Sequence, residues 1–201
     1  YFGHSVDLSG DGKILIVGAK GFNNTSLLSS THDGGLVRVY ANISGVWTQI
    51  GNDLIGNHNY ENLGLSVSIS DDGSKIAVGG NNIESPGNST NTYDGIVSIY
   101  EYISGTWSQM GQDLHGSADY TTTSSYFGFS VQLSGDGATI AIGAPNGTVG
   151  SSEVGLVSVY NYSNNNWSQV GTNLFGEVQD SYFGCDVSLS YNGEKLIVGS
   201  P

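Results

Sequence analysis

Short segments in which apolar and polar residues alternate recur four times along the chain. Residues 5–9 read SVDLS, and the same alternation returns at residues 66–70, 130–134 and 186–190. A period of two residues places successive side chains on opposite faces of a β-strand. We therefore predict a strand in each segment, with its two apolar residues on one face.

A nearly continuous apolar run follows each alternating segment. It reads ILIVGA from Ile14 in the first copy and LIVGSP from Leu196 in the last. Such runs are typical of strands that are covered on both faces. An Asp-Gly or Asn-Gly pair separates the two segments each time, as at residues 11–12, and is the sequence signal of a short hairpin. We therefore expect the two strands to pair, with the apolar run lying deep.

Two further predicted strands complete the pattern in three of the copies. The first reads LVRVY from Leu36 and returns as IVSIY and LVSVY, whose β-branched and aromatic residues favour strands. The second is more polar and begins at Trp47, Trp107 and Trp167, which stand 60 residues apart. Strong helix formers are scarce, so we expect almost no helix. Each unit is predicted to be a four-stranded antiparallel meander.

A single sheet of this kind cannot bury both of its faces, but similar sheets can cover one another around an axis. The pattern thus predicts an all-β fold of β-propeller blades, about three and a half of them in residues 1–201. We place the units at residues 1–61, 62–124 and 125–180, with half a unit at 181–201. The regular spacing of the tryptophans favours packing between blades over an exposed aromatic platform.

In the copy that begins at Tyr126, the complete repeat contains YFG, SV, LS, DG, IAIGAP, VY and W. This repeat resembles the FG-GAP repeat of integrin α-chain propellers and of many secreted repeat proteins. The resemblance covers nearly the whole chain. It implies a seven-bladed ring, of which this chain is about half, completed by further blades of the same or another polypeptide.

The same resemblance raises the question of calcium, because blades of this family often carry an aspartate-rich calcium loop between their first two strands. The turns of this chain hold at most two carboxylates and are too short to surround an ion, which needs six to eight oxygens. We therefore expect no cofactor, and calcium in these turns is the alternative.

Charge and composition narrow the class of partner. Five Lys and Arg against 18 Asp and Glu give a net charge of −13, which disfavours nucleic acid and anionic membrane surfaces. No apolar segment is long enough for a membrane span. The single cysteine, Cys185, excludes an internal disulfide. The chain has no initiator Met or signal peptide and starts and stops within a unit, which we interpret as a piece of a longer protein.

Recurrence argues against catalysis, because an active site is ordinarily built once, whereas stacked repeats keep the same residues in every copy. Ser5, Ser66 and Ser130 follow a glycine as in a nucleophile elbow, but that motif also needs a second glycine and a following helix. The Gly-Asp-Gly at residues 10–12 suggests a phosphate loop, but a strand follows it. We therefore predict no catalytic residue, no metal site and no enzyme activity.

Long and variable connections gather at one end of the predicted strands, where the second strand leads to the third and the fourth to the next unit. We call this end the long-connection face; it comprises residues 21–33, 57–62, 81–93, 117–125, 146–153 and 177–181. Variable connections on a regular scaffold are typical of recognition surfaces. We predict ligand contacts there from Asn59, Tyr60, Asp94, Asp119 and Tyr120.

Sequences that accept N-linked glycans occur at Asn23, Asn24, Asn42, Asn88, Asn146, Asn161 and Asn166. With the low charge density and the missing redox thiols, they favour an extracellular or cell-surface glycoprotein. The leading interpretation is a non-catalytic module for adhesion or recognition that binds an extracellular protein or a glycan. The alternatives are a structural subunit of an extracellular fibre, appendage or shell, and a propeller-type hydrolase with its site outside this chain.

Overall fold

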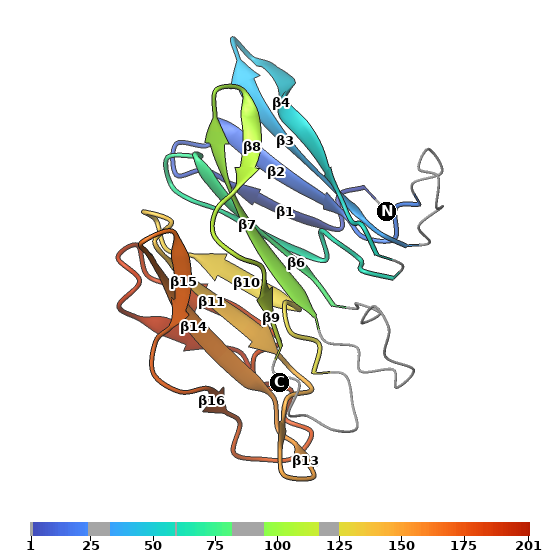
Figure 1. The fold of residues 1–201 in the computed structure, drawn as a ribbon, viewed down its shortest axis with the longest axis vertical. Helices are drawn as coiled ribbons and strands as arrows, with labels where there is room; N and C mark the ends of the chain where they lie inside the picture. The colour runs from blue at the N-terminus through green and yellow to red at the C-terminus, as the bar shows by residue number, and fades with distance from the viewer. Residues whose placement is uncertain (1, 24–32, 59, 82–94, 117–124) are drawn as a thin grey trace.

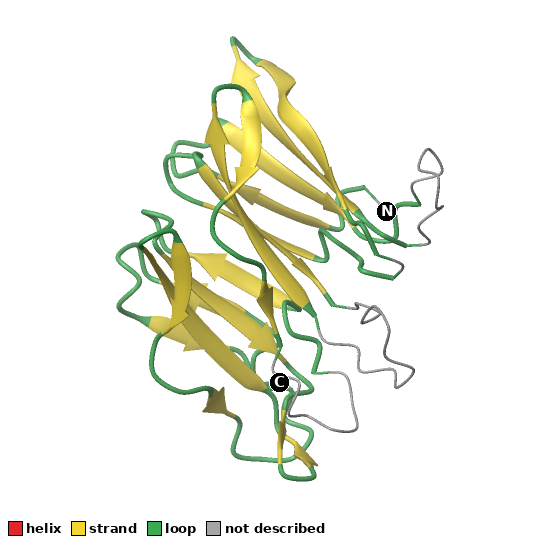
Figure 2. Cartoon of the chain, viewed as in Figure 1, coloured by secondary structure: helices red, strands yellow, loops and turns green. Residues whose placement is uncertain are grey.

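A computed structural model describes residues 2–23, 33–58, 60–81, 95–116 and 125–201. In this part of the chain all regular secondary structure is β-strand, and no helix occurs (Figure 2). It follows that the described residues include no helix with the length and apolar character needed to cross a membrane. The expectation of almost no helix is confirmed for these residues.

The first sheet is a four-stranded antiparallel meander. Its strands are β1 (Ser5–Leu8), β2 (Ile14–Ala19), β3 (Leu36–Ile43) and β4 (Val46–Ile55), paired in the order of the sequence. The turn between β1 and β2 contains Gly12, whose φ of +68° is the left-handed conformation that glycine adopts without a Cβ clash. The Asp-Gly pair thus forms the predicted hairpin.

The second and third sheets repeat this arrangement with a divided outer strand. The second sheet consists of β5 (Ser66–Ile69), β6 (Lys75–Gly80), β7 (Ile96–Ile103), β8 (Thr106–Gln109) and β9 (Leu114–His115). The third sheet consists of β10 (Ser130–Leu133), β11 (Thr139–Ala144), β14 (Leu156–Ser163), β15 (Asn166–Gln169) and β16 (Leu174–Phe175). In both, the short last strand pairs with the third strand of the meander.

The last residues of the chain form half of a sheet. β17 (Val187–Leu189) pairs with β18 (Leu196–Val198) as the first two strands of a meander. A separate small hairpin, β12 (Thr148–Val149) with β13 (Ser152–Glu153), lies in the connection between β11 and β14.

The sheets stack face to face with their first strands side by side (Figure 1). β1 lies next to β5, β5 next to β10, and β10 next to β17. The strands that carry the tryptophans, β4, β8 and β15, form the opposite edges of their sheets. Sheets arranged in this way around their first strands are β-propeller blades, so the predicted fold class is confirmed as a partial β-propeller.

Apolar side chains fill the space between neighbouring sheets. Val39 of the first sheet packs in one cluster with Val67 and Trp107 of the second. Ile99 of the second sheet packs in another cluster with Trp167 of the third. Full burial of one such side chain stabilises the fold by about 1.5–3 kcal/mol, so stacking provides the core that no single sheet has.

The first sheet departs from the predicted burial, because no described sheet covers its outward face. Val6 is 61% exposed, whereas its counterpart Val67 is 9% exposed. Trp47 is 43% exposed, whereas Trp107 is 3% exposed. Trp107 and Trp167 therefore pack between blades as expected, whereas the packing of Trp47 against a further blade stays a prediction.

Candidate functional site

The two ends of the strands differ in how their turns are built. At the hairpin end, the Asp11 carboxylate accepts hydrogen bonds from the Ser9 hydroxyl and from the Lys13 amide, each of 2.9 Å. Asp72 and Asp136 make the same pair of contacts in their own turns. The hydrogen bonds and the charge of Lys13 lower the pKa of Asp11 to about 2. These carboxylates therefore close turns.

The described residues contain no group of three or more His, Cys, Asp or Glu side chains that could hold a metal ion.

The serines that resemble a nucleophile elbow connect neighbouring sheets. The Ser5 hydroxyl donates to the carbonyl oxygen of Gly64 at 2.8 Å, and Ser130 makes the same contact with Gly184. Ser66 makes this contact with Gly128, so in all three complete sheets the hydroxyl bonds a backbone carbonyl and has a structural role, as the recurrence predicts.

The opposite end is the long-connection face. In the first sheet Ala19, Leu36 and Ile55 stand at this end in register, so the connections after β2 and β4 leave from the same face. Tyr60 is described there; it is 45% exposed, and its φ of +59° is left-handed. The predicted contacts Asn59, Asp94, Asp119 and Tyr120 lie outside the described residues.

The glycan acceptor asparagines are also only partly described. Asn23, Asn161 and Asn166 are exposed, whereas Asn42 and Asn146 are half-buried. Asn24 and Asn88 lie outside the described residues.

A polar cluster that the sequence analysis missed recurs in the three complete sheets, where the third strand meets the fourth strand or the segment that follows it. In the second sheet, the Asp113 carboxylate accepts from the Gln109 amide at 2.7 Å and from the Ser98 hydroxyl. In the first sheet, Asp53 instead forms a two-point ion pair with Arg38 at 2.7 and 2.9 Å, which lowers the pKa of its carboxyl group.

The third sheet has a neutral version of this cluster. The side-chain oxygen of Asn173 accepts from the Gln169 amide at 2.5 Å and from the Ser158 hydroxyl at 2.8 Å. A glutamine that precedes an Asp or Asn by four residues in every copy is the sequence signal that could have identified the cluster.

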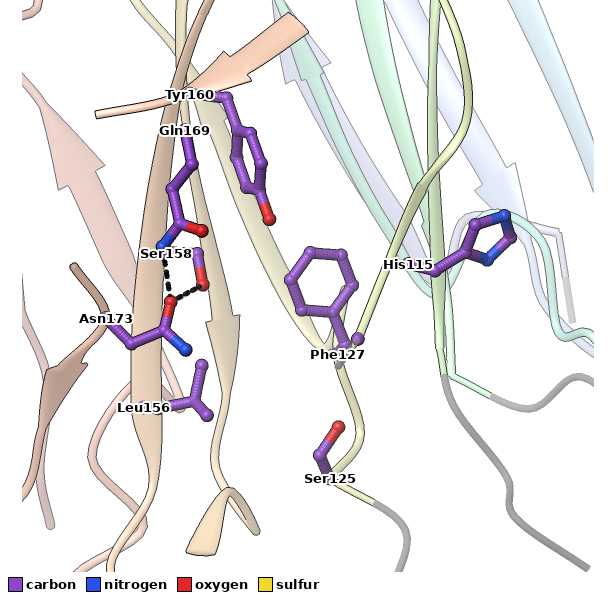
Figure 3. Close-up of a pocket in the computed structure, with 9 residues that line it drawn as sticks. His115, Ser125, Phe127, Leu156, Ser158, Tyr160, Gln169 and Asn173 are labelled. Carbon is purple, nitrogen blue, oxygen red and sulfur yellow. Dashed lines mark hydrogen bonds between the residues drawn. The ribbon is translucent and has the colours of Figure 1, made fainter. Parts of the chain in front are cut away.

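A cavity of about 70 Å³ lies beside the neutral cluster, between the second and third sheets (Figure 3). Gly116, Ser125, Phe127, Leu156 and Tyr160 line it together with the cluster. His115 contributes to the lining, but its imidazole ring points away from the other labelled side chains. The cavity stands where the chain leaves the second sheet after Gly116 and resumes at Ser125, on the long-connection face.

Ser125 is the unusual residue of this cavity. It is 1% exposed, and its hydroxyl has no hydrogen-bond partner among the residues that the structure describes. A buried polar group without a partner costs about 1–3 kcal/mol, so such groups commonly mark a bound water, ion or ligand. Burial also raises the pKa of Tyr160, which therefore remains a neutral hydroxyl. The cavity can bind polar groups by hydroxyls and amides, and its lining offers no nucleophile with a paired base.

Comparison with known proteins identifies the fold. No protein-family model and no curated protein sequence matches the chain. Among solved structures, the chain is similar to a putative 6-phosphogluconolactonase from Bacteroides uniformis, with a TM-score of 0.57 and 13% identity over 98% of this chain and 47% of that one.

Two other structures are similar at lower scores. The periplasmic gluconolactonase PpgL of Pseudomonas aeruginosa has a TM-score of 0.47 and 16% identity, over 96% of this chain and 64% of that one. The β-propeller domain of the Trilobed protease from Pyrococcus furiosus has a TM-score of 0.49 and 13% identity, over 98% of this chain and 49% of that one. The chain therefore spans about half to two thirds of the length of these proteins.

The expectation that the chain is not an enzyme needs correction. The Bacteroides uniformis protein, which shares the fold over 98% of this chain, is named as an enzyme. Recurrence of the motif, on which the expectation was based, is therefore no ground for excluding an enzyme. At 13% identity the likeness shows the fold alone, and the activity of that protein is not carried over to this chain.

Proposed function

We propose that this chain is the ligand-recognising part of a larger β-propeller protein, and that it binds a glycan or an extracellular protein through the long-connection face. The observation that carries the proposal is the difference between the two ends of the strands. One end has four short turns of closely similar sequence, three of which are closed by the same serine and aspartate contacts. The other end has the irregular connections, an exposed Tyr60 and the polar cavity.

The chemistry of the long-connection face suits a ligand rich in hydroxyl groups. An exposed tyrosine ring can stack on a sugar ring while its hydroxyl remains available for a hydrogen bond. The cavity adds neutral donors and acceptors next to the connection that precedes Ser125. These features favour a glycan over a strongly charged ligand.

The test is binding of the protein to a panel of immobilised oligosaccharides, with Tyr60→Ala as the variant. We expect the substitution to weaken binding about tenfold or more, as the loss of an aromatic contact at the centre of an interface does. Tyr191→Ala is the matched control, because Tyr191 is also exposed but lies in a hairpin turn at the opposite end. Binding that survives Tyr60→Ala and is lost in Tyr191→Ala would refute the proposal.

The second candidate is a propeller-type hydrolase whose reacting groups include residues outside this chain. The fold likeness to the Bacteroides uniformis protein favours it. Gluconolactone and 6-phosphogluconolactone are the substrates to test, with the complete protein. Turnover above the spontaneous rate of ring opening would support a lactonase, and its absence would remove this candidate.

An extracellular location and glycosylation are further proposals. The exposed Asn161 and Asn166 are accessible to the glycosylation machinery. Intact mass of the secreted protein before and after enzymatic removal of N-linked glycans tests this, and an unchanged mass counts against it. A role in adhesion and a role in a fibre or shell, like membership of the FG-GAP family, stay proposals that rest on the sequence.

We propose that further blades pack against the sheets at the two ends of the described stack. The indole of Trp107 lies over Gly51, and that of Trp167 over Gly111, whereas nothing lies within 4 Å of the corresponding position on Gly171. At the other end Trp47 is 43% exposed and covers no sheet within the described part of the chain. The chain makes this contact of a tryptophan with a glycine twice between its own sheets. Among the described residues, the first sheet has a tryptophan, Trp47, without such a glycine beneath it, and the third sheet has a glycine, Gly171, without a tryptophan over it.

A further inference from the structure

The half sheet formed by β17 and β18 has an open edge. β18 pairs with β17, and no other described strand pairs with it. The amide of Ser190 donates to the carbonyl of Lys195 at 2.9 Å, so the backbone groups of Lys195 face the side of β17. Backbone direction alternates along an antiparallel strand, so the N–H and C=O groups of Leu196 and Val198 face the open edge. This edge therefore offers backbone donors and acceptors to a further strand.

Beside this edge, the third sheet exposes apolar residues whose counterparts in the second sheet are buried. Val170 is 48% exposed, whereas Met110, which takes the same place in the second sheet, is 7% exposed. Leu174 is 46% exposed, whereas its counterpart Leu114 is 4% exposed. The second sheet therefore has a cover at these two positions that the third sheet lacks in the described part of the chain.

In the second sheet the cover comes from a third and a fourth strand. Met110 and Leu114 belong to one apolar cluster with residues of the third sheet. Leu156 of β14 and Trp167 of β15 are among these residues, and each is 2% exposed. The half sheet repeats β10 and β11 as β17 and β18 and has no described counterpart of β14 and β15. The third sheet therefore lacks the cover that these two strands would provide.

A glycine on the third sheet matches the tryptophan of such a fourth strand. The nearest atom of the Trp167 indole is 2.8 Å from the position that a Cβ would take on Gly111. Gly171 takes the same place in the third sheet and has the same left-handed backbone, with a φ of +70°. No described atom lies within 4 Å of its Cβ position. The surface over Gly171 therefore has room for an indole.

A groove near the end of β18 matches the start of such a third strand. It has a volume of about 520 Å³, and its lining includes Leu174, Phe183 and Ser200. Phe127, the counterpart of Phe183, lines the smaller cavity of about 70 Å³ between the second and third sheets. Leu156, the first residue of β14, also lines that cavity. The groove is therefore the space that the first residue of an added third strand would enter.

We propose that the open edge of β18 binds a β-hairpin that has the sequence pattern of the third and fourth strands of this repeat. The first strand of the hairpin pairs antiparallel with β18, with its tyrosine opposite Leu196, as Tyr160 stands opposite Ile140 in the third sheet. The tryptophan of its second strand lies over Gly171. This inference rests on the proposal of further blades and specifies which strands they supply at this end. Glycan binding is measured separately, so either proposal can fail alone.

The probe is a synthetic peptide with the sequence of residues 154–176, added to the whole chain. Hydrogen exchange followed by NMR reports on the edge, because the amides of Leu196 and Val198 are the donors that an added strand would use. We expect saturable binding that slows the exchange of both amides by about tenfold or more. A peptide with Trp167→Ala should bind about tenfold more weakly, because it lacks the aromatic contact with the glycine.

A matched pair of substitutions in the chain tests where the peptide binds. Leu174→Glu places a charge where the hairpin would cover an apolar side chain, and it should weaken peptide binding by about tenfold or more. Val6→Glu is the control, because Val6 is 61% exposed but lies on the outward face of the first sheet. This variant should keep the affinity of the unmodified chain within about twofold. If Leu174→Glu does not fold, the comparison of the two peptides decides, since it leaves the chain unmodified.

Several results would overturn the proposal. They are unchanged exchange of the Leu196 and Val198 amides in the presence of the peptide, equal binding of the two peptides, and equal weakening by Leu174→Glu and Val6→Glu. Protection of the same amides in a dimer of the chain without peptide would also overturn it, because a second copy would then cover the edge. Loss of peptide binding while oligosaccharides still bind would refute this inference and leave the glycan proposal intact.

Discussion

The hydroxyl of Ser66 donates a hydrogen bond of 2.7 Å to the carbonyl oxygen of Gly128, across the boundary between the second and third sheets. A Cβ on Gly79 would lie 2.3 Å from both of these oxygens. The glycine of the second strand therefore makes room for a bond between its own sheet and the next. This relationship explains why the three complete copies keep a serine in the first strand and a glycine in the second, without any catalytic role.

Removal of the hydroxyl should weaken the stacking of the sheets. We expect Ser66→Ala to lower the free energy of unfolding by about 1–2 kcal/mol, because the buried carbonyl of Gly128 loses its partner. Urea denaturation followed by far-UV circular dichroism measures the change. Ser108→Ala, at an exposed position of β8, is the control and should change stability by less than about 0.5 kcal/mol. Equal effects of the two substitutions would show that the bond is dispensable.

Loss of the glycine should be more damaging than loss of the serine. Gly79→Ala forces a methyl group against the backbone of the neighbouring sheet, and we expect a loss of about 3 kcal/mol. Gly199 occupies the same slot in the half sheet, where the nearest atom to a Cβ is at 3.3 Å. Gly199→Ala should therefore be tolerated, with a loss below about 1 kcal/mol in the same denaturation experiment. A Gly199 variant as unstable as the Gly79 variant would contradict the steric explanation.

The strands could be predicted from sequence because the alternating segments and the apolar runs each depend only on residues that are neighbours in the chain. The alternation at residues 5–9 and the apolar run from Ile14 specify strands whatever surrounds them, and Asp-Gly fixes the turn between them. The burial of a side chain, in contrast, depends on which other sheet packs against it. Trp47 and Trp107 occupy the same place in the repeat, but only Trp107 has a neighbouring sheet to cover. Sequence alone could not separate them.

The candidate site was harder to predict for a related reason. The long connections directed the prediction to one end of the strands, but most of the contacts chosen there lie outside the described residues, so the choice of that end stays a prediction. The cavity is lined by side chains that stand far apart in the sequence, such as Ser125, Phe127 and Leu156, and not by a shared motif. Its volume follows from how two neighbouring sheets pack, which no single copy of the repeat specifies.

Substitution of a tryptophan should destabilise the protein only where its ring packs against a neighbouring sheet. Trp107→Ala removes a ring that is 3% exposed and whose indole nitrogen donates to the carbonyl of Ile50 at 3.3 Å. We expect it to destabilise the protein by about 3–5 kcal/mol. Trp47→Ala is the matched control and should change stability by less than about 1 kcal/mol in this chain. Both values come from urea denaturation.

Fluorescence offers a second measurement on the unmodified chain. Acrylamide should quench the emission of Trp47 readily and that of Trp107 and Trp167 weakly, because only Trp47 is substantially exposed. The Trp47 variant should then lose the easily quenched component. Uniform quenching of all three tryptophans would contradict the stacked arrangement.

Glu61 should make stability depend on pH. Burial raises its pKa above the ordinary value of 4.5, and the nearby negative charge of Asp113 acts in the same direction. A carboxyl group whose pKa is raised by folding favours the folded state below its unfolded pKa. That contribution is lost as the pH rises through the higher, folded value. At neutral pH the folded chain therefore holds a buried carboxylate at a cost that the unfolded chain does not have.

Glu61→Gln should remove this cost while its side-chain oxygen still accepts from the amides of Asn57 and His58. We expect the free energy of unfolding of the variant, relative to that of the unmodified protein, to increase from pH 4 toward neutral pH, by about 1.4 kcal/mol for each unit by which the pKa is raised. Urea denaturation at several pH values measures the difference. Glu177→Gln, at an exposed position, controls for the loss of one negative charge and should give a flat difference. A flat difference for Glu61→Gln as well would mean that the Glu61 carboxyl group is solvated in the folded protein.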